Sequence, residues 1–245
     1  MRFAVIGGTG RIGSRLVGVL NAAGHEAVPH ARSTGVDLLT GAGLAQALAG
    51  AEVVIDVSQS PTTDDSSRAF FQTTMDHLLA AAGAAGVGHV VLLSIVGVDQ
   101  VPGLGYYRAK VHQENLLKAG PIPYSIVRAT QFFEFVEDVM GWTTDGDTVR
   151  LPATPMQPVA AADVTAALAE VALGDPLRGV RDIAGPDVFL LTELGRMTLA
   201  ARGDGRRTVV TDDTAGPFAA VEGEAIIAGS GASLAPTHYR DWLKG

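Results

Sequence analysis

Short apolar runs alternate with amphipathic segments over most of the chain. Uninterrupted apolar runs are typical of buried parallel strands, and apolar positions at three- and four-residue spacing are typical of helices. The runs predict strands at residues 3–6, 26–30, 52–57, 89–93 and 123–127. The spacing predicts helices that begin near Ile12 and at about residues 41–48, 66–85 and 106–117. Strands and helices in this alternation predict an α/β fold with a doubly wound parallel sheet.

The last third of the chain is less regular. We predict a small turn and strand at residues 142–151, helices at 164–173 and 192–201 capped by Asp163 and Thr192, a strand at 208–211 and a short helix at 236–243. Residues 1–150 are interpreted as the core. Residues 151–245 are interpreted as a mixed region that completes the core and forms a small carboxy-terminal substrate lobe, within one continuous structural unit.

Glycines follow the first predicted strand at once. Residues 7–13 read GGTGRIG, which satisfies both GxGxxG and GxxGxxG between a strand and a helix. Without β-carbons the turn can be tight, and its backbone can approach a pyrophosphate at the helix N-terminus. The motif predicts a Rossmann-type dinucleotide site, with a purely structural turn as the alternative. The turn residues expected at the dinucleotide are Gly7, Thr9, Gly10, Arg11, Ile12 and Gly13.

The residues after the second predicted strand indicate which dinucleotide is bound. An acidic residue there would hold a ribose 2′-hydroxyl, but residues 30–33 read HARS. Arg32 can pair with a 2′-phosphate, Ser33 can donate a hydrogen bond to it, and Arg11 can approach it from the glycine turn. We therefore predict NADP(H) as the cofactor. The alternative is that both arginines are ordinary solvated surface residues.

Two further segments are expected along the dinucleotide. Asp37 either lies against the adenine or caps a loop. Val57, Ser58 and Gln59 leave the third predicted strand where a dinucleotide crosses the edge of the sheet, so we expect contact through the backbone.

A candidate catalytic set follows the fourth predicted strand. Ser94 ends that strand, and Tyr106 and Lys110 lie four residues apart on one face of the next helix. A neighbouring ammonium would lower the pKa of a tyrosine phenol, and a serine hydroxyl can orient a carbonyl substrate. Tyr107 is the alternative to Tyr106, because a Gly/Pro-rich loop precedes both. The structural alternative is a helix start with an exposed Lys110 and a packed Tyr106.

Composition excludes several other classes of protein. The chain has 245 residues, 47% of them hydrophobic, a formal net charge of −8 and no cysteine. A large core can form, while disulfides, thiol chemistry and thiolate metal sites are excluded. The acidic balance without a basic run disfavours nucleic acid as a partner. No metal-ligand spacing is present, and we expect no signal peptide, no membrane span and a cytoplasmic location.

These motifs together resemble the short-chain dehydrogenase/reductase superfamily, specifically its atypical NmrA-like branch. The resemblance covers roughly residues 1–185 and is carried by GGTGRIG, HARS, LLSIVGV from Leu92, YYRAK from Tyr106, IPYSIVRATQFFEF from Ile122, QPVAAADVTAAL from Gln157 and DIAGP from Asp182. It implies that Lys110 lies at the nicotinamide ribose. It also implies that residues after the fifth strand line the nicotinamide end and the substrate cleft, namely Ala129, Thr130, Gln131 and Phe132. Phe133 either borders an apolar substrate there or packs beneath the cleft.

The function expected from this sequence is an NADP-dependent oxidoreductase. It would transfer hydride to or from a small organic carbonyl, alkene or quinone-like substrate, with Tyr106 as proton donor, Lys110 at the ribose and Ser94 at the substrate oxygen. One alternative is a non-catalytic NADP(H)-binding redox sensor that acts through a protein partner, because some members of the branch lack a working Ser-Tyr-Lys set. Another is an NAD(P)-dependent epimerase or eliminase.

Overall fold

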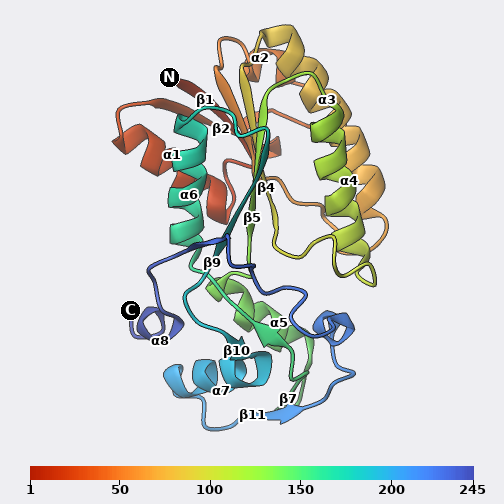
Figure 1. Ribbon diagram of the computed structural model, residues 1–245, viewed down its shortest axis with the longest axis vertical. Coiled ribbons are helices and arrows are strands. Elements are labelled where there is room, and N and C mark those ends of the chain that lie inside the picture. Colours follow the sequence, from red (N-terminus) through yellow and green to blue (C-terminus); the bar gives the residue numbers. More distant parts are fainter. The chain divides into compact units, whose positions relative to one another are not determined.

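The computed structural model describes residues 1–245 and groups them into two compact units (Figure 1). The first unit contains Met1–Ile95, Gly105–Arg128 and Val164–Arg181. The second contains Val96–Leu104, Ala129–Asp163 and Asp182–Gly245. The chain therefore passes repeatedly between the units, which are interleaved in sequence rather than divided at residue 150.

A seven-stranded sheet with the order β12-β9-β5-β4-β3-β1-β2 forms the framework of the fold. Its strands are β1 (Arg2–Ile6), β2 (Glu26–His30), β3 (Val53–Asp56), β4 (His89–Ile95), β5 (Tyr124–Ala129), β9 (Gly179–Ala184) and β12 (Ser233–Leu234). β1 pairs in parallel with both β2 and β3, so that Phe3 lies opposite Ala27 on one side and Val53 on the other. β3 and β4 are also parallel. The predicted parallel sheet is confirmed.

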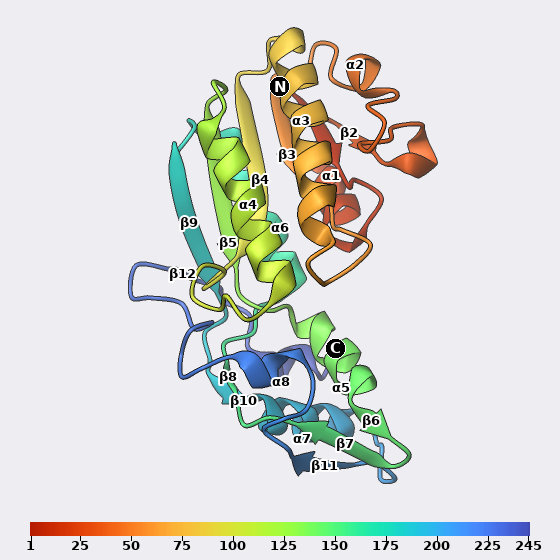
Figure 2. The ribbon, with the colours of Figure 1, turned by 90° about the vertical axis from the view of Figure 1, so that its right-hand side faces the viewer.

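Helices of the first unit cover both faces of this sheet. They are α1 (Arg11–Ala22), α2 (Leu44–Ala47), α3 (Ser67–Ala85), α4 (Gly105–Ala119) and most of α6 (Ala161–Leu173). α1 and α6 lie on one face, and α3 and α4 lie side by side on the other (Figures 1 and 2). This arrangement is the expected doubly wound one. None of the helices is long and apolar enough to cross a membrane.

Helix α3 shows how the apolar period builds the core. Phe71, Met75, Leu78 and Ala82 recur at helical spacing and are all buried. The last three pack in a cluster with strand residues such as Val54, Val90 and Ile126. The helix ends at Gly86, whose φ of 71° is a conformation that glycine adopts at no steric cost.

Two predicted helix caps are wrong. α6 begins at Ala161, whose N–H donates to the Glu134 carboxylate at 3.2 Å, so the cap comes from a distant residue rather than from Asp163. Asp163 instead accepts a hydrogen bond from the backbone of Thr237. α7 (Leu191–Ala201) begins one residue before Thr192, and Glu193 reaches back to accept the N–H of Leu190 at 2.9 Å.

The second unit contains a small sheet with the order β11-β7-β6. Its strands are β6 (Thr144–Asp145), β7 (Thr148–Leu151) and β11 (Thr208–Thr211). β8 (Pro155–Met156) and β10 (Phe189–Leu190) form a separate antiparallel pair. The short helices are η2 (Phe133–Phe135), α5 (Val136–Trp142), η3 (Pro217–Ala220) and α8 (Tyr239–Trp242). α8 is shorter than the helix predicted at residues 236–243.

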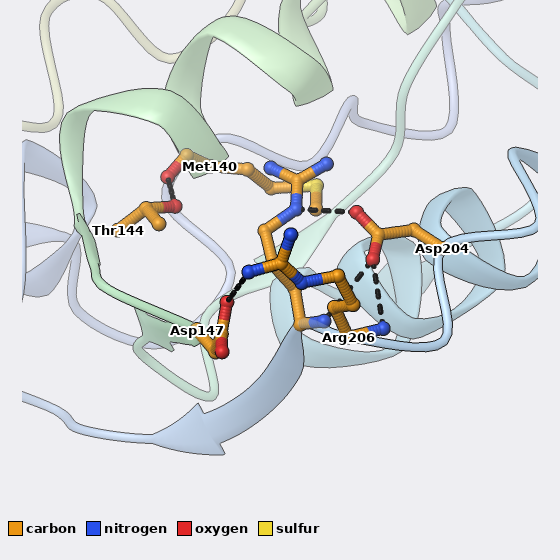
Figure 3. Close-up of polar contacts among 6 residues, drawn as sticks. Met140, Thr144, Asp147, Asp204 and Arg206 are labelled. Atoms are coloured by element: carbon orange, nitrogen blue, oxygen red, sulfur yellow. Dashed lines mark hydrogen bonds and ion pairs between the residues drawn. The ribbon is translucent and has the colours of Figure 1, made fainter.

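The turn after α7 is fixed to the β6–β7 turn by polar contacts (Figure 3). Asp204 accepts the backbone N–H groups of Arg206 and Arg207 and the Arg207 guanidinium, contacts that hold the pKa of its carboxyl near 2. Arg206 lies 3.6 Å from Asp147 in the hairpin turn. Thr144 at the start of β6 donates to the carbonyl of Met140 at 2.6 Å.

Aromatic rings from separate segments form the core of the second unit. The Phe133 ring lies 5.0 Å from that of Tyr239 and 5.6 Å from that of Trp242, centroid to centroid. The Tyr239 hydroxyl hydrogen-bonds to Thr198 at 2.7 Å. Rings at such distances attract each other beyond their burial of apolar area, so α8 is held by Phe133.

We expect Phe133→Ala to lower the free energy of unfolding of the second unit by about 3–5 kcal/mol, because it deletes a fully buried ring. The measurement is urea-induced unfolding followed by tryptophan fluorescence, since Trp142 and Trp242 both belong to this unit. The control is Val188→Ala, at a position 54% exposed, which should change stability by no more than about 0.5 kcal/mol. Equal stability of the two variants would contradict the packing of Phe133.

Candidate functional site

The glycine turn between β1 and α1 is fixed by backbone hydrogen bonds. The N–H groups of Gly7 and Gly8 both donate to the carbonyl of His30, at 2.9 and 3.2 Å, and Gly10 N–H donates to Gly7 O at 3.0 Å. Gly7 has a φ of +76°, and a β-carbon at Gly13 would lie 2.3 Å from Gly7 O. No side chain fits at Gly13 without moving the backbone.

This turn leaves the N-terminus of α1 open. Gly10 occupies the cap position with no side chain to accept a hydrogen bond, and the first helical turn contains no acidic residue. The first N–H groups of a helix have no partner within it, and they carry the positive end of the helix dipole. The cradle therefore fits an anion such as the pyrophosphate of a dinucleotide, as the motif predicts.

Arg11 opens the helix at the end of this turn, and Arg32 lies two residues after His30, whose carbonyl accepts the N–H groups of Gly7 and Gly8. Arg11 opens α1, and Arg32 opens η1 (Arg32–Thr34) directly after β2. Both side chains are exposed, as is Ser33, and neither guanidinium pairs with a carboxylate. Two uncompensated cations close to the ends of β1 and β2 can receive a phosphate. Asp37 accepts the N–H of Leu39 at 2.8 Å. This contact caps a loop, which is one of the two roles expected of Asp37.

The end of β3 approaches the glycine turn. Val57 N–H donates to Ile6 O at 3.0 Å, and a β-carbon at Gly7 would lie 2.9 Å from Val57 O. Ser58 follows, and its N–H donates to Asp56 Oδ1 at 2.9 Å. The Ser58 hydroxyl is buried without a partner of good geometry, although it is close enough to the Asp56 carboxylate to oppose the rise in its pKa. Gln59 is exposed. A buried hydroxyl without a well-placed partner beside the cradle is a further polar group that a ligand can satisfy.

Lys110 is buried on α4, contrary to the alternative of an exposed surface lysine. Its ammonium donates to Leu93 O at 2.8 Å and to Gln113 Oε1 at 2.5 Å, and it lies 5.1 Å from the centre of the Phe71 ring. Burial lowers the pKa of Lys110 to about 8, against the opposing effect of the Asp56 and Glu114 carboxylates. Lys110 is therefore held in a fixed position, and its pKa lies well below that of a solvated lysine.

The expected lowering of the Tyr106 pKa by Lys110 is wrong for this structure. Burial raises the pKa of Tyr106, and the Asp56 carboxylate raises it further. The Lys110 ammonium is committed to Leu93 and Gln113, while the Tyr106 ring packs 6.0 Å from that of Phe71. The phenol consequently stays protonated at neutral pH. Tyr107, the alternative candidate, is buried as well.

Ser94 lies beside a different buried charge. Its hydroxyl has no hydrogen-bond partner of good geometry, although it is close enough to Glu114 to help lower the pKa of that carboxyl. Burial alone would raise that pKa, but two hydrogen bonds from Arg128, each 2.8 Å long, and one from Lys118 bring it to about 2. No hydrogen bond joins Ser94, Tyr106 and Lys110 to one another.

Sequence reasoning missed two buried polar residues, Asp56 and Gln113. Gln113 Nε2 donates to Asp56 Oδ2 at 3.0 Å, while its Oε1 accepts from Lys110. The available signals were a carboxylate in the otherwise apolar strand EVVIDV and an amide three residues after Lys110 on the same helix.

Ala129, which ends β5, and the predicted residues that follow it belong to the second unit. Ala129 and Thr130 are buried, and the Thr130 hydroxyl has no hydrogen-bond partner there. Gln131 O accepts the N–H of Val159 at 2.9 Å, and Phe132 forms a β-bridge with Val159. Phe133 is only 1% exposed. It therefore packs in the interior, which was the alternative expected from the sequence, and it cannot border a substrate without rearrangement.

Comparisons with known proteins agree with a nicotinamide dinucleotide as the ligand of the glycine cradle. Residues 7–173 match a family model described as NAD(P)H-binding. A (4-alkanoyl-5-oxo-2,5-dihydrofuran-3-yl)methyl phosphate reductase of Streptomyces griseus is 30% identical over 207 residues, which cover 78% of this chain. The match spans 63% of the length of that relative.

Solved structures of similar fold include nucleotide-sugar enzymes. A dTDP-glucose 4,6-dehydratase from Streptomyces venezuelae, a variant with NAD bound, gives a TM-score of 0.75 at 19% identity and covers 100% of this chain and 95% of its own. A dTDP-4-dehydrorhamnose reductase from Bacillus anthracis in complex with NADP gives 0.73 at 15% identity, with 99% and 97% coverage. A UDP-N-acetylglucosamine 4-epimerase from Bacillus cereus gives 0.74 at 14%, with 100% and 94% coverage. These similarities show that the chain shares the fold of these enzymes.

We expect Gly13→Ala to lower the free energy of unfolding by about 1–3 kcal/mol, because its methyl group meets Gly7 O and the Gly8 backbone. The matched control is Gly18→Ala in the same helix, where a β-carbon meets nothing within 4 Å. That variant should gain about 0.5–1 kcal/mol from the helix propensity of alanine. Urea unfolding followed by far-UV circular dichroism measures both, and a neutral Gly13→Ala would refute the close packing.

Proposed function

Because the chain belongs to the NAD(P)H-binding family, we propose that it is an NADP-dependent oxidoreductase of the atypical short-chain dehydrogenase/reductase type. Its substrate would be a small organic molecule with a carbonyl, alkene or quinone-like group. The proposal rests above all on the open glycine cradle, with the unpaired, exposed Arg11 at its end and Arg32 two residues after the His30 carbonyl that holds the turn. A bound nicotinamide supplies the hydride acceptor or donor.

The preference for NADP over NAD follows from charge at the end of β2. A carboxylate there would repel a ribose 2′-phosphate, whereas Arg32 carries the opposite charge and no competing anion pairs with it. Ser33 adds an exposed hydroxyl in the same turn. Within the first unit, the glycine turn and Val57, Ser58 and Gln59 would supply the remaining dinucleotide contacts.

Two residues of α4 and Ser94 of β4 would serve the chemistry. Lys110 would hold the nicotinamide ribose, because its buried ammonium has three N–H donors and the protein engages two of them. Tyr106 keeps its proton at neutral pH, which is the form that a proton donor needs. Ser94 would hold the substrate oxygen through its unpartnered hydroxyl.

The Streptomyces griseus relative supports a reductive direction and one class of acceptor. Its name describes a reductase acting on a dihydrofuranone that carries an alkanoyl group and a methyl phosphate group. For this chain we therefore place unsaturated lactones and related enones first among the candidate substrates. The expected setting is the cytoplasm, with a small molecule rather than nucleic acid or membrane as partner.

A second candidate is a non-catalytic NADP(H)-binding regulator that recognises a protein partner. One observation favours it: Tyr106 has a raised pKa and no hydrogen bond to Ser94 or Lys110. A weak acid outside a connected network contributes little to proton transfer. Binding of the dinucleotide itself is common to both candidates.

We expect the purified protein to bind NADPH at least about tenfold more tightly than NADH, a difference of roughly 1.4 kcal/mol. Titration followed by nicotinamide fluorescence measures both constants. Arg32→Ala should weaken NADPH binding about tenfold and leave NADH binding unchanged, because only NADPH carries the 2′-phosphate. The control is Arg196→Ala, an exposed position on α7 in the second unit. Equal affinities in the wild type would remove Arg32 and Arg11 as selectors.

Turnover separates the enzyme from the regulator. NADPH consumption with a panel of unsaturated lactones, enones, aldehydes and quinones should identify an acceptor. Tyr106→Phe should then lower kcat about 10²–10⁴-fold with little change in NADPH affinity, because it removes only the proton donor. Tyr124→Phe, at a half-buried tyrosine of β5, is the matched control. Full activity of Tyr106→Phe would show that the phenol donates no proton, and absence of turnover with every acceptor would favour the regulator.

A further inference from the structure

A chain of buried polar contacts runs from the loop after β3 to the ammonium of Lys110. Ser58 N–H donates to Asp56 Oδ1 at 2.9 Å, and Asp56 Oδ2 accepts from Gln113 Nε2 at 3.0 Å. Gln113 Oε1 accepts from Lys110, which also donates to Leu93 O. Asp56, Gln113 and Lys110 are each no more than 3% exposed. Both ends of this chain, Ser58 and Lys110, are among the proposed dinucleotide contacts.

The amide of Gln113 can bridge these two charges in one orientation only. Its oxygen faces the ammonium and its NH₂ group faces the carboxylate, as each partner requires. Rotation of the amide would turn an N–H donor toward Lys110 and an oxygen toward Asp56. Because an unpaired buried charge is expensive, the environment selects the observed orientation, and Gln113 in turn fixes where Lys110 lies.

The neighbouring ion pair on α4 is built differently. Glu114 contacts Arg128 directly through two hydrogen bonds and Lys118 through a third. Those charges neutralise one another, whereas Asp56 and Lys110 are kept apart by a neutral amide. Burial raises the pKa of Asp56, while its hydrogen bonds to Ser58 and Gln113 and the charge of Lys110 oppose that rise. The bridge leaves one of the three ammonium protons of Lys110 uncommitted.

We infer that Gln113, supported by Asp56, is a positioning residue that holds the Lys110 ammonium and the Ser58 loop in one arrangement for the dinucleotide. This inference rests on the proposed function, because Lys110 and Ser58 matter here as dinucleotide contacts. Gln113 and Asp56 make these contacts in the ligand-free protein. Their effect on Lys110 can therefore be measured without the dinucleotide.

The first readout is the charge of Lys110 in the ligand-free protein. The chain's lysines are Lys110, Lys118 and Lys244, so ¹³Cε-lysine NMR resolves and assigns them by single substitutions. The groups that act on Lys110 are Asp56 from β3 and Glu114 from α4, with the Tyr106 phenol close to Asp56. The wild-type lysine should titrate near pH 8. Gln113→Leu should lower its pKa, because a hydrogen bond to the ammonium favours the charged form.

The second readout is dinucleotide affinity. Gln113→Leu should weaken NADPH binding about tenfold or more. The pH at which wild-type binding weakens, near 8 as Lys110 loses its proton, should move lower in the variant. Asp56→Asn is the second variant should Gln113→Leu not fold. It removes the carboxylate that raises the Lys110 pKa, so that this pKa and the affinity should both fall.

The matched control is Gln72→Leu. Gln72 on α3 forms a similar bridge at the surface, donating to Asp76 at 2.8–2.9 Å and contacting His112 of α4 at 2.7 Å. Its removal should change neither the Lys110 pKa nor the NADPH affinity. A general effect of losing a bridging glutamine amide that packs against α4 would appear in this variant too and would overturn the inference.

The outcomes separate this inference from the proposed function. If the wild type binds neither dinucleotide, the proposed function and the positioning role are both overturned, because there is then no dinucleotide for Gln113 to position Lys110 for. Tight wild-type binding with unchanged affinity in a folded Gln113→Leu protein would overturn the positioning role alone, whatever the Lys110 pKa does. We expect the Lys110 pKa and the NADPH affinity both to fall in Gln113→Leu and neither to change in the Gln72→Leu control.

Discussion

The close backbone packing of the turn after β1 is the constraint on which the first unit depends. Gly13 approaches Gly7 O so closely that a single methyl group has no room, and the His30 carbonyl holds both Gly7 and Gly8 N–H groups. This packing joins β1, β2 and the start of α1 in one rigid corner. The same lack of side chains leaves the helix N-terminus open, so the feature that stabilises the corner also makes it able to receive an anion.

The second constraint is the burial of charge at the carboxyl ends of β3 and β4. Burying a carboxylate and an ammonium opposes folding unless each finds partners. The protein meets this requirement in two ways on the same helix. Glu114 is saturated by Arg128 and Lys118, whereas Lys110 is held through Gln113 and Leu93 with donor capacity to spare. A saturated pair is suited to structure, and an incompletely engaged ammonium is suited to a ligand.

The second unit is stabilised by other means. Its sheet has three short strands, and aromatic rings from η2 and α8 pack against one another. Phe133 is central to that packing because it contacts both Tyr239 and Trp242. The ring therefore fixes the end of the chain, and the neighbouring half-buried Phe132 remains the better candidate for contact with a ligand.

The sequence by itself determined the features that are local. Apolar runs located β1 to β5, the glycine spacing located the turn, and the four-residue step placed Tyr106 and Lys110 on one helix. Only the tertiary structure decided which partner each polar group finds. Glu134 rather than Asp163 caps α6, Gln113 and Leu93 rather than Tyr106 engage Lys110, and Phe133 packs inside the second unit. These outcomes depend on burial and on contacts between residues far apart in the chain, which periodicity along the sequence does not encode.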